Sequence, residues 1–405
     1  MKILFDNQIF TWQKYGGVSR YFYEIMNQFY RKEIDFVFPM ENIVNQYVLN
    51  SSFYKEAKQK NYKETKQKKS YFKTILKHFL YKPFPGKGIL LKLYGKSFPG
   101  KLLFTKHLMK IHTDIQNQYV QFFLQMQEFD IFHPTYYDPY FLNYLDEKPF
   151  VLTVYDMIHQ IFPEYFMKDD MVIKWKKSLI EKASKVIAIS ENTKQDIIRL
   201  FGINESKIEV IYLGNSLNPK NNDSSLSIPE KYILFVGNRS IYKNFNFFIT
   251  SISSLFIKDP SLNLICVGGG PISKEEKDLF CKLKISNNVS YYPFLEDDNL
   301  VFLYKNALAF VFPSLYEGFG LPILEAFACQ CPVISSNTSS LPEIAGEAAI
   351  YFDPKDDLSI KQAIEKVIYN NDLRNNLKNL GKVQLKKFSW EKTAQETLQL
   401  YQSLI

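Results

Sequence analysis

Two glutamates flank a short glycine-bearing turn in the segment LAFVFPSLYEGFGLPILEAF. Glu317 precedes Gly318–Gly320, and Glu325 follows with seven residues between the two carboxylates. A buried strand is expected before the turn, and Pro322 marks the first turn of a helix after it. The glycines let the backbone pass close to a ligand, and the amides at the helix start form an anion site. The pattern predicts two carboxylates beside a phosphate-binding turn.

This segment resembles the paired-glutamate motif of the family 4 retaining glycosyltransferases, which have the GT-B fold. Glu317 and Glu325 match the two glutamates, and GFGLP matches the residues usual between them. The resemblance implies that Glu317 contacts the transferred sugar, that Glu325 holds the ribose hydroxyls, and that the amides of Phe319, Gly320 and Leu321 face sugar and phosphate. The alternative is a surface helix cap at Glu317 and a solvated helix residue at Glu325.

A second segment, FVGNRSIYKN, carries two cations after a strand. Gly237 is expected at the strand end, with Arg239 and Lys243 in the following loop. A departing diphosphate needs its charge neutralised, and in the family a basic pair at these positions grips the nucleotide diphosphate. The alternative is two solvated loop cations.

A diphosphate can also be neutralised by a metal ion. The chain has no Asp-x-Asp pair, the metal-binding signature of the other large glycosyltransferase fold. We therefore expect a nucleotide-diphosphate sugar as the donor substrate, with no metal and no cofactor.

The amino-terminal part offers weaker signals. Gly16 and Gly17 precede a predicted helix, as a similar glycine pair does in the family near the phosphate of the sugar donor and the acceptor, and Arg20 follows as an anion contact. In LTVYDMIHQIF the family often has His-Asp facing the reaction centre, whereas Tyr155 stands here at the His position.

Further candidate site residues follow from these patterns. Asp156 matches the family's Asp and is the first choice for the catalytic group of this domain, with His159 second because a neutral imidazole accepts a proton near pH 7. His133 is expected near the cleft because strand ends point at the ligand crevice. The glycine run 268–271 is expected to approach the nucleotide base.

Short apolar runs alternate with helix-length amphipathic segments, which indicates βαβ units and parallel sheets. The fold class is therefore α/β, and the resemblance implies two doubly wound, Rossmann-like domains facing across a cleft. The expected strands are 2–5, 35–38, 130–133, 150–154, 185–189, 208–212, 232–237, 262–270, 288–292, 307–314 and 332–336.

A segment rich in Asn, Ser and Pro, 215–230, reads as the linker between two domains. We expect an acceptor-side domain over 1–217 and a nucleotide-sugar-binding domain over 218–385. The residues 386–405 resemble the family's last helices, which cross back to brace the first domain.

The segment from about 45 to 115 interrupts the alternation and is strongly basic, in a chain whose net charge is +8. Residues 55–110 contain sixteen lysines and two glutamates, and YFKTILKHFL places its apolar side chains on one helix face. Such a helix can lie on an anionic membrane through residues 70–110, or its apolar face can pack on the first domain. The two alternatives remain open.

Composition excludes several classes of protein. No run of eighteen uncharged apolar residues predicts a membrane-spanning helix, and the start lacks the apolar stretch of a signal peptide, so we expect a cytoplasmic protein, peripheral on the inner face of the membrane if the basic helix binds it. The four cysteines lack zinc-ligand spacing and are expected as reduced thiols.

Together these features predict a hexosyltransferase that moves a sugar, with retention, from a nucleotide-diphosphate sugar to a glycan or lipid-linked glycan acceptor in the synthesis of an O-antigen-like or capsule-like polysaccharide. One alternative is a GT-B nucleotide-sugar epimerase, which uses no acceptor. Another is a basic nucleic-acid-binding protein, against which stands the confinement of the lysines to one segment without a groove-reading motif. We expect no nucleic-acid partner.

Overall fold

The computed structural model describes residues 1–40, 42–58, 120–166, 170–220, 226–239 and 241–405. The chain divides into two compact units, residues 1–150 and 151–405. Each unit is built from parallel strands with helices between them, so the predicted α/β class is confirmed. The basic residues 70–110 lie outside the described part of the chain.

The first unit holds a three-stranded parallel sheet of order β2-β1-β3. Strand β1 (Ile3–Phe5) is central, with Ile3 paired to Phe36 of β2 (Phe36–Val37) and to Ile131 of β3 (Ile131–His133). Within the described residues, the helical segments of this unit include α1 (Gln8–Trp12), α2 (Gly17–Arg31), α3 (Gln46–Asn50) and the 3-10 helix η1 (Pro139–Asn143).

Helix α2 covers this sheet with an aromatic face. Tyr21, Phe22, Ile25, Met26 and Phe29 recur at helical spacing and are completely buried. The ring of Phe5 on β1 contacts the rings of Phe22 and Phe29, at centroid distances of 6.0 and 6.4 Å. Burial of these large side chains holds α2 on the sheet, since each contributes roughly 1.5–3 kcal/mol.

The second unit begins with another three-stranded parallel sheet, of order β4-β5-β6. Its strands are β4 (Val151–Val154), β5 (Lys185–Ala188) and β6 (Ile208–Val210). The connecting helical segments are α7 (Ile158–Ile161), η2 (Pro163–Tyr165), α8 (Met171–Lys182), α9 (Glu191–Phe201) and η3 (Glu205–Lys207). Helix α9 begins after its N-cap Ser190, whose hydroxyl accepts a hydrogen bond from the Thr193 amide.

A six-stranded parallel sheet forms the rest of the second unit, in the order β12-β11-β10-β7-β8-β9. Its strands are β7 (Tyr232–Val236), β8 (Asn263–Val267), β9 (Val289–Tyr292), β10 (Ala309–Phe312), β11 (Val333–Ser336) and β12 (Ala349–Phe352). Its longer helices are α10 (Phe245–Lys258), α11 (Lys274–Lys282), α12 (Asp297–Asn306), α13 (Leu321–Ala328), α15 (Asp357–Ile368), α16 (Asn371–Leu385) and α17 (Trp390–Gln402). The short helical segments are η4 (Ile241–Lys243), η5 (Ser286–Asn288), α14 (Leu341–Ala345) and η6 (Gly346–Ala348).

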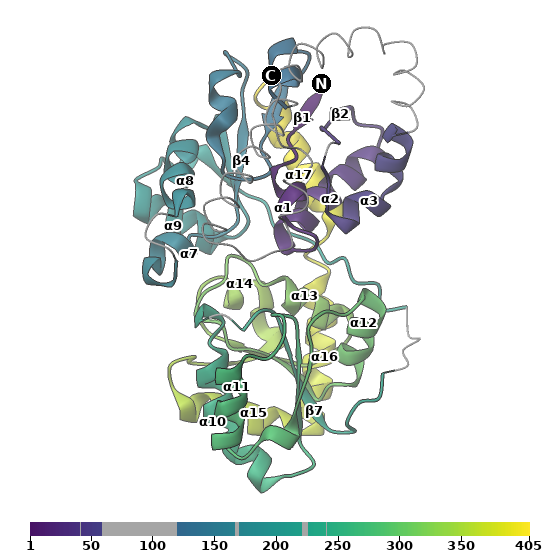
Figure 1. Cartoon of the computed structure of the whole chain (residues 1–405), viewed down its shortest axis with the longest axis vertical. Helices are drawn as coiled ribbons and strands as arrows, with labels where there is room; N and C mark the ends of the chain where they lie inside the picture. The colour runs from purple at the N-terminus through teal and green to yellow at the C-terminus, as the bar shows by residue number, and fades with distance from the viewer. Residues whose placement is uncertain (41, 59–119, 167–169, 221–225, 240) are drawn as a thin grey trace, which may run out of the picture. The chain divides into compact units, whose positions relative to one another are not determined.

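Helices cover both faces of this sheet. Figure 1 shows α10, α11 and α15 on one side of β7, and α12, α13 and α16 on the other. The core between α10, α15 and the strands is apolar, with Phe235, Phe248, Ile252 and Ile364 at most 1% exposed. Near-continuous burial of the strands is what a parallel sheet covered on both faces requires.

The predicted strands occur at the expected places, with ends shifted by up to three residues, and β12 adds a strand beyond them. The expected domain boundary at 217/218 lies inside the second compact unit and stays a prediction. Helix α17, in the predicted crossing segment 386–405, donates hydrogen bonds from Trp390 Nε1 to Ser216 Oγ (2.8 Å) and from Thr393 Oγ1 to the Tyr212 carbonyl (2.6 Å).

Candidate functional site

The strand order of the six-stranded sheet locates its ligand edge. Counted along the chain from β7, the strands lie in the order 3-2-1-4-5-6, so the chain direction across the sheet reverses between β7 and β10. Ligands bind such sheets at the carboxyl ends of the strands beside this switch point. The segment after β7 begins with Gly237, and the segment after β10 contains Glu317. The fold thus brings the two predicted motifs to one place.

Lys243 and Glu317 form a buried ion pair at this edge. The Lys243 Nζ lies 2.5 Å from Glu317 Oε1, and the two side chains are 13% and 14% exposed. Burial lowers the pKa of Lys243, but the charges of Glu317, Tyr242 and Asp156 outweigh it and raise the pKa above its ordinary value. The ammonium group also lies 5.3 Å from the centre of the Phe312 ring. Lys243 therefore stays protonated and is held in place by Glu317.

The turn after Glu317 is fixed by hydroxyl groups. Ser340 Oγ donates to the carbonyl oxygens of Glu317 (2.9 Å) and Phe319 (3.0 Å), and Ser190 Oγ donates to the carbonyl oxygen of Gly318 at 2.7 Å. The amide of Glu317 donates to Ser339 Oγ at 2.9 Å. The peptide planes of the turn are consequently held in one orientation.

The two glycines of the turn, Gly318 and Gly320, meet two different steric requirements. A Cβ on Gly318 would overlap the carbonyl oxygen of Tyr155, so this residue permits a close backbone approach. Gly320 has a φ of 110° and is the N-cap of α13, with Leu321 as the first helical residue. Both positions agree with the predicted turn into an anion-binding helix start, and the ligand role of these amides stays a prediction.

Glu325 lies inside α13 and is partly buried. Its Oε2 accepts a hydrogen bond from the hydroxyl of Tyr304, on α12, at 3.2 Å. Phe319 is 3% exposed and packs between the rings of Tyr212 and Phe388. The Phe319 side chain is thus core, which leaves only its backbone for the predicted contact.

Arg239 holds the glycine run 268–271. Its guanidinium donates to the carbonyl oxygens of Gly268 (2.6 Å), Gly270 (3.1 Å) and Pro271 (3.1 Å), and its Nε donates to Glu276 Oε1 at 2.5 Å. The Arg239 side chain is 4% exposed in this ion pair. The structure places Arg239 beside the glycine run and Lys243 beside Glu317, and their joint binding of a diphosphate stays a prediction.

The glycine run has the left-handed backbone that only glycine adopts at low cost. Residues 268, 269 and 270 have φ angles of 94°, 77° and 73°. The run follows β8 directly, next to Gly237 after β7. Its carbonyl groups face Arg239, so a single side chain determines the shape of the loop.

Asp156 and His159 follow β4 in the same unit. Asp156 Oδ1 accepts a hydrogen bond from the Ile158 amide at 3.1 Å and lies 3.5 Å from Lys176 Nζ, while Lys176 donates to the Asp156 carbonyl at 2.9 Å. Lys176 is 1% exposed, and burial lowers its pKa although Asp156 opposes the shift. A Cβ on Gly318 would lie 3.0 Å from the Cβ of Asp156, so Asp156 lies beside the glycine turn that follows Glu317.

His159 lies on α7 with one ring face covered. Its ring stacks on Phe166 at 4.0 Å, and its Nε2 is 3.6 Å from Asp170 Oδ2. Its buried Nδ1 has no hydrogen-bond partner within the described part of the chain. Burial and the charge of Lys176 lower the pKa of His159, so the imidazole is neutral near pH 7.

Gly16, Gly17 and Arg20 belong to the first unit. Gly16 has extended backbone and is the N-cap of α2, and Gly17 is the first residue of that helix, as predicted. Arg20 donates to the hydroxyl of Tyr47 at 2.8 Å and lies over its ring. These residues are described within their own unit, and their contact with a sugar donor stays a prediction.

The prediction that His133 lies near a ligand cleft was wrong, because its side chain is buried. His133 ends β3, as predicted, but its side chain is fully buried between the rings of Phe5 and Phe22. Burial lowers its pKa to about 3, which keeps it neutral. A strand-end histidine facing aromatic neighbours on α2 becomes part of the core.

Several residues that no sequence pattern indicated also support the site. The Tyr316 hydroxyl donates to Asp196 Oδ2 at 2.7 Å and accepts from the Met157 amide at 3.3 Å, which joins α9 and α7 to the glycine turn. Glu343 accepts from the amides of Glu191 and Asn192 at the start of α9. Tyr316 stands directly before Glu317, and that adjacency was the one local signal.

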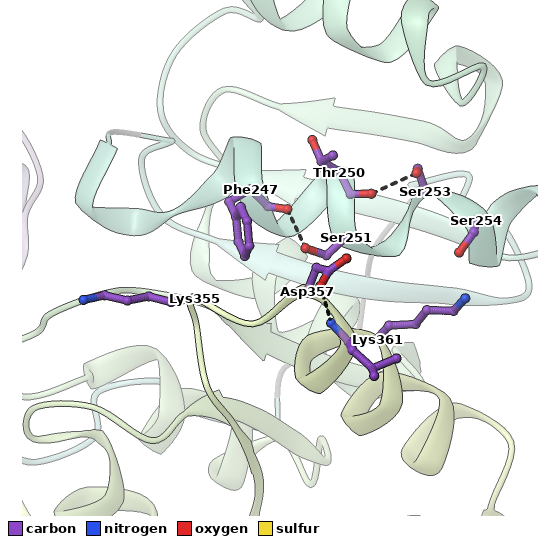
Figure 2. Close-up of a pocket in the computed structure, with 9 residues that line it drawn as sticks. Phe247, Thr250, Ser251, Ser253, Ser254, Lys355, Asp357 and Lys361 are labelled. Carbon is purple, nitrogen blue, oxygen red and sulfur yellow. Dashed lines mark hydrogen bonds between the residues drawn. The ribbon is translucent and has the colours of Figure 1, made fainter.

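A separate groove of about 610 Å³ lies between α10 and the start of α15. Figure 2 shows Phe247, Ser251, Asp357 and Lys361 around it. Its lining includes none of the predicted site residues. The four cysteines are free thiols, three of them buried. Within the described ranges, no group of three or more metal-ligating side chains is suited to hold a metal ion, and no helix has the length and apolarity to cross a membrane.

Comparisons with known proteins agree with these motifs. Residues 197–384 match the family described as Glycosyl transferases group 1, and residues 95–218 match Glycosyltransferase Family 4. The chain is 31% identical over 291 residues to O-antigen chain mannosyltransferase B of Escherichia coli, covering 68% of this chain and 74% of that protein. It is 30% identical over 217 residues to O-antigen chain mannosyltransferase RfbU of Salmonella typhimurium, covering 53% of this chain and 60% of that protein.

Solved structures show the same fold. Anabaena Alr3699/HepE, in complex with UDP and glucose, superposes with a TM-score of 0.65 at 18% identity over 100% of both chains. A glycosyltransferase from Rickettsia africae has a TM-score of 0.63 at 18% identity, covering 100% of this chain and 98% of that one. Sequence relatives and fold agree, and the chain belongs to the family 4 glycosyltransferases, with the GT-B fold.

Proposed function

We propose that this glycosyltransferase moves a hexosyl residue from a nucleotide-diphosphate sugar to a hydroxyl of a glycan or lipid-linked glycan, during synthesis of a surface polysaccharide. The names of the relatives support this proposal, since two of them are O-antigen mannosyltransferases. Mannose is accordingly the first sugar to test. The nucleotide-binding half is supported by the complexes of Alr3699/HepE with UDP and with UDP-glucose.

The single observation that carries the proposal is the buried Lys243–Glu317 pair at the sheet's switch point. A diphosphate binding there replaces the carboxylate as the partner of the Lys243 ammonium. The start of α13 adds backbone amides and the positive end of a helix dipole. These groups stabilise the charge that develops on the leaving diphosphate, usually the largest contribution to such catalysis.

In the transfer, the bond between the anomeric carbon and the diphosphate oxygen breaks, and a bond to the acceptor oxygen forms. The acceptor hydroxyl gives its proton to a basic group of the site. Asp156 is our first choice for that group, because its side chain lies beside the glycine turn after Glu317 and Lys176 holds its carboxylate in place. His159 is second, as a neutral imidazole whose Nδ1 is unpaired within the described residues.

Retention of the anomeric configuration is part of the proposal. We expect the product glycoside to keep the configuration of the sugar donor. The one-bond carbon–proton coupling at the anomeric carbon of the product, measured by NMR, tests it. A product of opposite configuration contradicts retention while leaving sugar transfer intact.

The function is tested by a thermal-shift and turnover screen with UDP-, GDP-, ADP- and dTDP-linked sugars, with and without chelator. We expect one sugar donor to stabilise the protein, Lys243→Ala and Glu325→Ala to abolish the shift, and chelator to leave it unchanged. Conversion of the sugar donor into its epimer without acceptor would identify an epimerase instead. No response to any donor would contradict the proposal.

Peripheral membrane contact is a separate part of the proposal and rests on the lysine-rich amphipathic sequence of residues 70–110. We expect the protein to sediment with anionic but not neutral liposomes. Replacing Lys69, Lys73 and Lys77 with glutamine should weaken that binding, since each lysine near the headgroups contributes about 1 kcal/mol. Equal binding by the two proteins, or none to anionic liposomes, would contradict membrane contact.

A further inference from the structure

Two aromatic side chains stand exposed next to the Gly16-Gly17 turn of the first unit. Trp12, the last residue of α1, is 50% exposed, and Tyr15 is 39% exposed. Among the described aromatic residues of this unit, exposure of 36% or more occurs at Trp12, Tyr15 and Tyr30, and the inner face of α2 is fully buried. Two exposed rings within four residues are therefore unusual for this part of the chain.

Each of the two exposed rings packs against another aromatic ring. Trp12 contacts the Tyr136 ring edge-to-face at 5.2 Å, and Tyr15 contacts the Tyr47 ring in the same manner at 5.5 Å. Tyr47 is itself held by the guanidinium of Arg20, which lies 4.7 Å above its ring. A side chain that is already ordered loses little entropy when a ligand covers it.

The rings lie at the ligand edge of their sheet. Residues 6–17 leave the carboxyl end of the central strand β1, and Tyr136 follows the end of β3. Parallel sheets bind ligands outside the carboxyl ends of their strands. The aromatic pair is thus on the side of the sheet where a substrate belongs.

The surroundings of the pair are polar. The side-chain Oε1 of Gln13 accepts a hydrogen bond from the Ser19 amide. The backbone carbonyl oxygen of Gln13 accepts a hydrogen bond from Asn45 Nδ2 at 2.8 Å. The Lys14 ammonium lies 5.9 Å from the centre of the Tyr15 ring. Apolar ring faces with a polar rim match a sugar, which has apolar C–H faces and a rim of hydroxyl groups.

Size distinguishes a sugar from a protein partner. A fully buried aromatic side chain covers about 150–250 Å², so two half-exposed rings offer roughly 200 Å². A stable protein interface buries about 800 Å² on each partner. The pair has the area for one or two sugar rings, and not for a protein surface.

We propose that Trp12 and Tyr15 form the acceptor-binding platform of this enzyme, on which a sugar ring of the acceptor glycan stacks. This inference rests on the proposed transfer to a glycan acceptor. Tyr136 and Tyr47 hold the two platform rings in position, and Arg20 acts through Tyr47.

The test compares Trp12→Ala and Tyr15→Ala with exposed aromatic residues of the second unit. Tyr369→Ala matches the first variant at 48% exposure, and Phe247→Ala, in the groove of Figure 2, matches the second at 39%. Binding is measured on an array of mannose oligosaccharides and bacterial polysaccharide fragments. Circular dichroism and melting temperature verify that each variant is folded.

We expect the wild type and the two control variants to bind the same glycans. The platform variants should bind them at least tenfold more weakly, and Trp12→Phe should restore most of the binding. The melting-temperature shift with the sugar donor should be the same in all six proteins, since Lys243 and Glu317, the groups proposed to bind that substrate, belong to the other unit. If the platform variants bind glycans normally, or if the wild type binds none, the inference is wrong. Loss of the sugar-donor response in the wild type would instead overturn the proposed function.

Discussion

Lys243→Met and Glu317→Gln should have opposite effects on the binding of the sugar donor. In the structure the Glu317 carboxylate forms an ion pair with the Lys243 ammonium, with Oε1 and Nζ 2.5 Å apart. A diphosphate must take over that ammonium to bind. Removing Lys243 deletes the cation, whereas neutralising Glu317 removes its competitor.

The magnitudes follow from the burial of the pair. A hydrogen bond to a charged group contributes about 1.5–3 kcal/mol, so Lys243→Met should weaken nucleotide-diphosphate binding roughly 10- to 150-fold. Glu317→Gln should leave that affinity unchanged or raise it a few fold. Its kcat should fall by about 10²–10³, the loss typical for a group that acts on the transition state.

The free energy of unfolding provides an independent test of the Lys243–Glu317 ion pair. Both side chains are less than 15% exposed. Breaking a buried ion pair costs about 3–5 kcal/mol, so each single variant should lower the free energy of unfolding by about 3 kcal/mol. The double variant should lose less than the sum of the two, by about 1–3 kcal/mol, because it leaves no charge unpaired.

Isothermal titration with UDP and GDP, urea unfolding and initial rates of transfer measure the three quantities. Lys231 and Asp259 supply the control, an ion pair at 2.6 Å at the other end of β7, with exposures of 36% and 18%. Lys231→Met and Asp259→Asn should change neither affinity nor kcat. If Glu317→Gln weakens nucleotide binding as strongly as Lys243→Met, the competition between carboxylate and diphosphate is refuted.

Three further outcomes are expected. Gly318→Ala should lower the free energy of unfolding by about 1–3 kcal/mol and reduce activity, because the added Cβ overlaps the Tyr155 carbonyl oxygen. The control is Gly202→Ala, at a left-handed helix end with open space around it. This variant should lower the free energy of unfolding, measured in urea, by only about 1–2 kcal/mol and leave activity unchanged. Burial raises the pKa of Asp6 to about 6, so the folded state favours its protonated form. Wild type should therefore gain up to about 3 kcal/mol relative to Asp6→Asn as the pH falls from 7.5 to 4, and a constant difference in urea unfolding would contradict this. Arg239→Gln should speed amide hydrogen exchange in residues 268–270 at least tenfold without affecting the β4-β5-β6 sheet, and unchanged exchange would show that Arg239 does not hold the loop.

Much of the site was predictable from local patterns. The glycine turn before α13, the Ser190 cap of α9 and the strands of the six-stranded sheet each depend on residues close together in the chain. A helix start needs a cap and a turn, and a buried strand needs a short apolar run. Such requirements leave a signature that is readable without a structure.

The rest depended on contacts between distant residues. Lys176 looks like any solvated lysine of an amphipathic helix, yet it is buried against Asp156, twenty residues earlier. Arg239 reads as a free loop cation, yet Glu276 and the glycine run hold it. His133 was expected near a ligand, yet α2 covers it with Phe22.

The sequence alone therefore determined the fold class, the family resemblance and the two motifs that meet at the switch point. Only the tertiary structure decided which charged groups are paired, which histidine is buried, and which aromatic rings remain exposed. The physical reason is the separation along the chain over which each interaction acts. Hydrogen-bonding caps and hydrophobic periodicity act over a few residues, whereas the partner of a buried charge is decided by how separate elements pack, which no local spacing records.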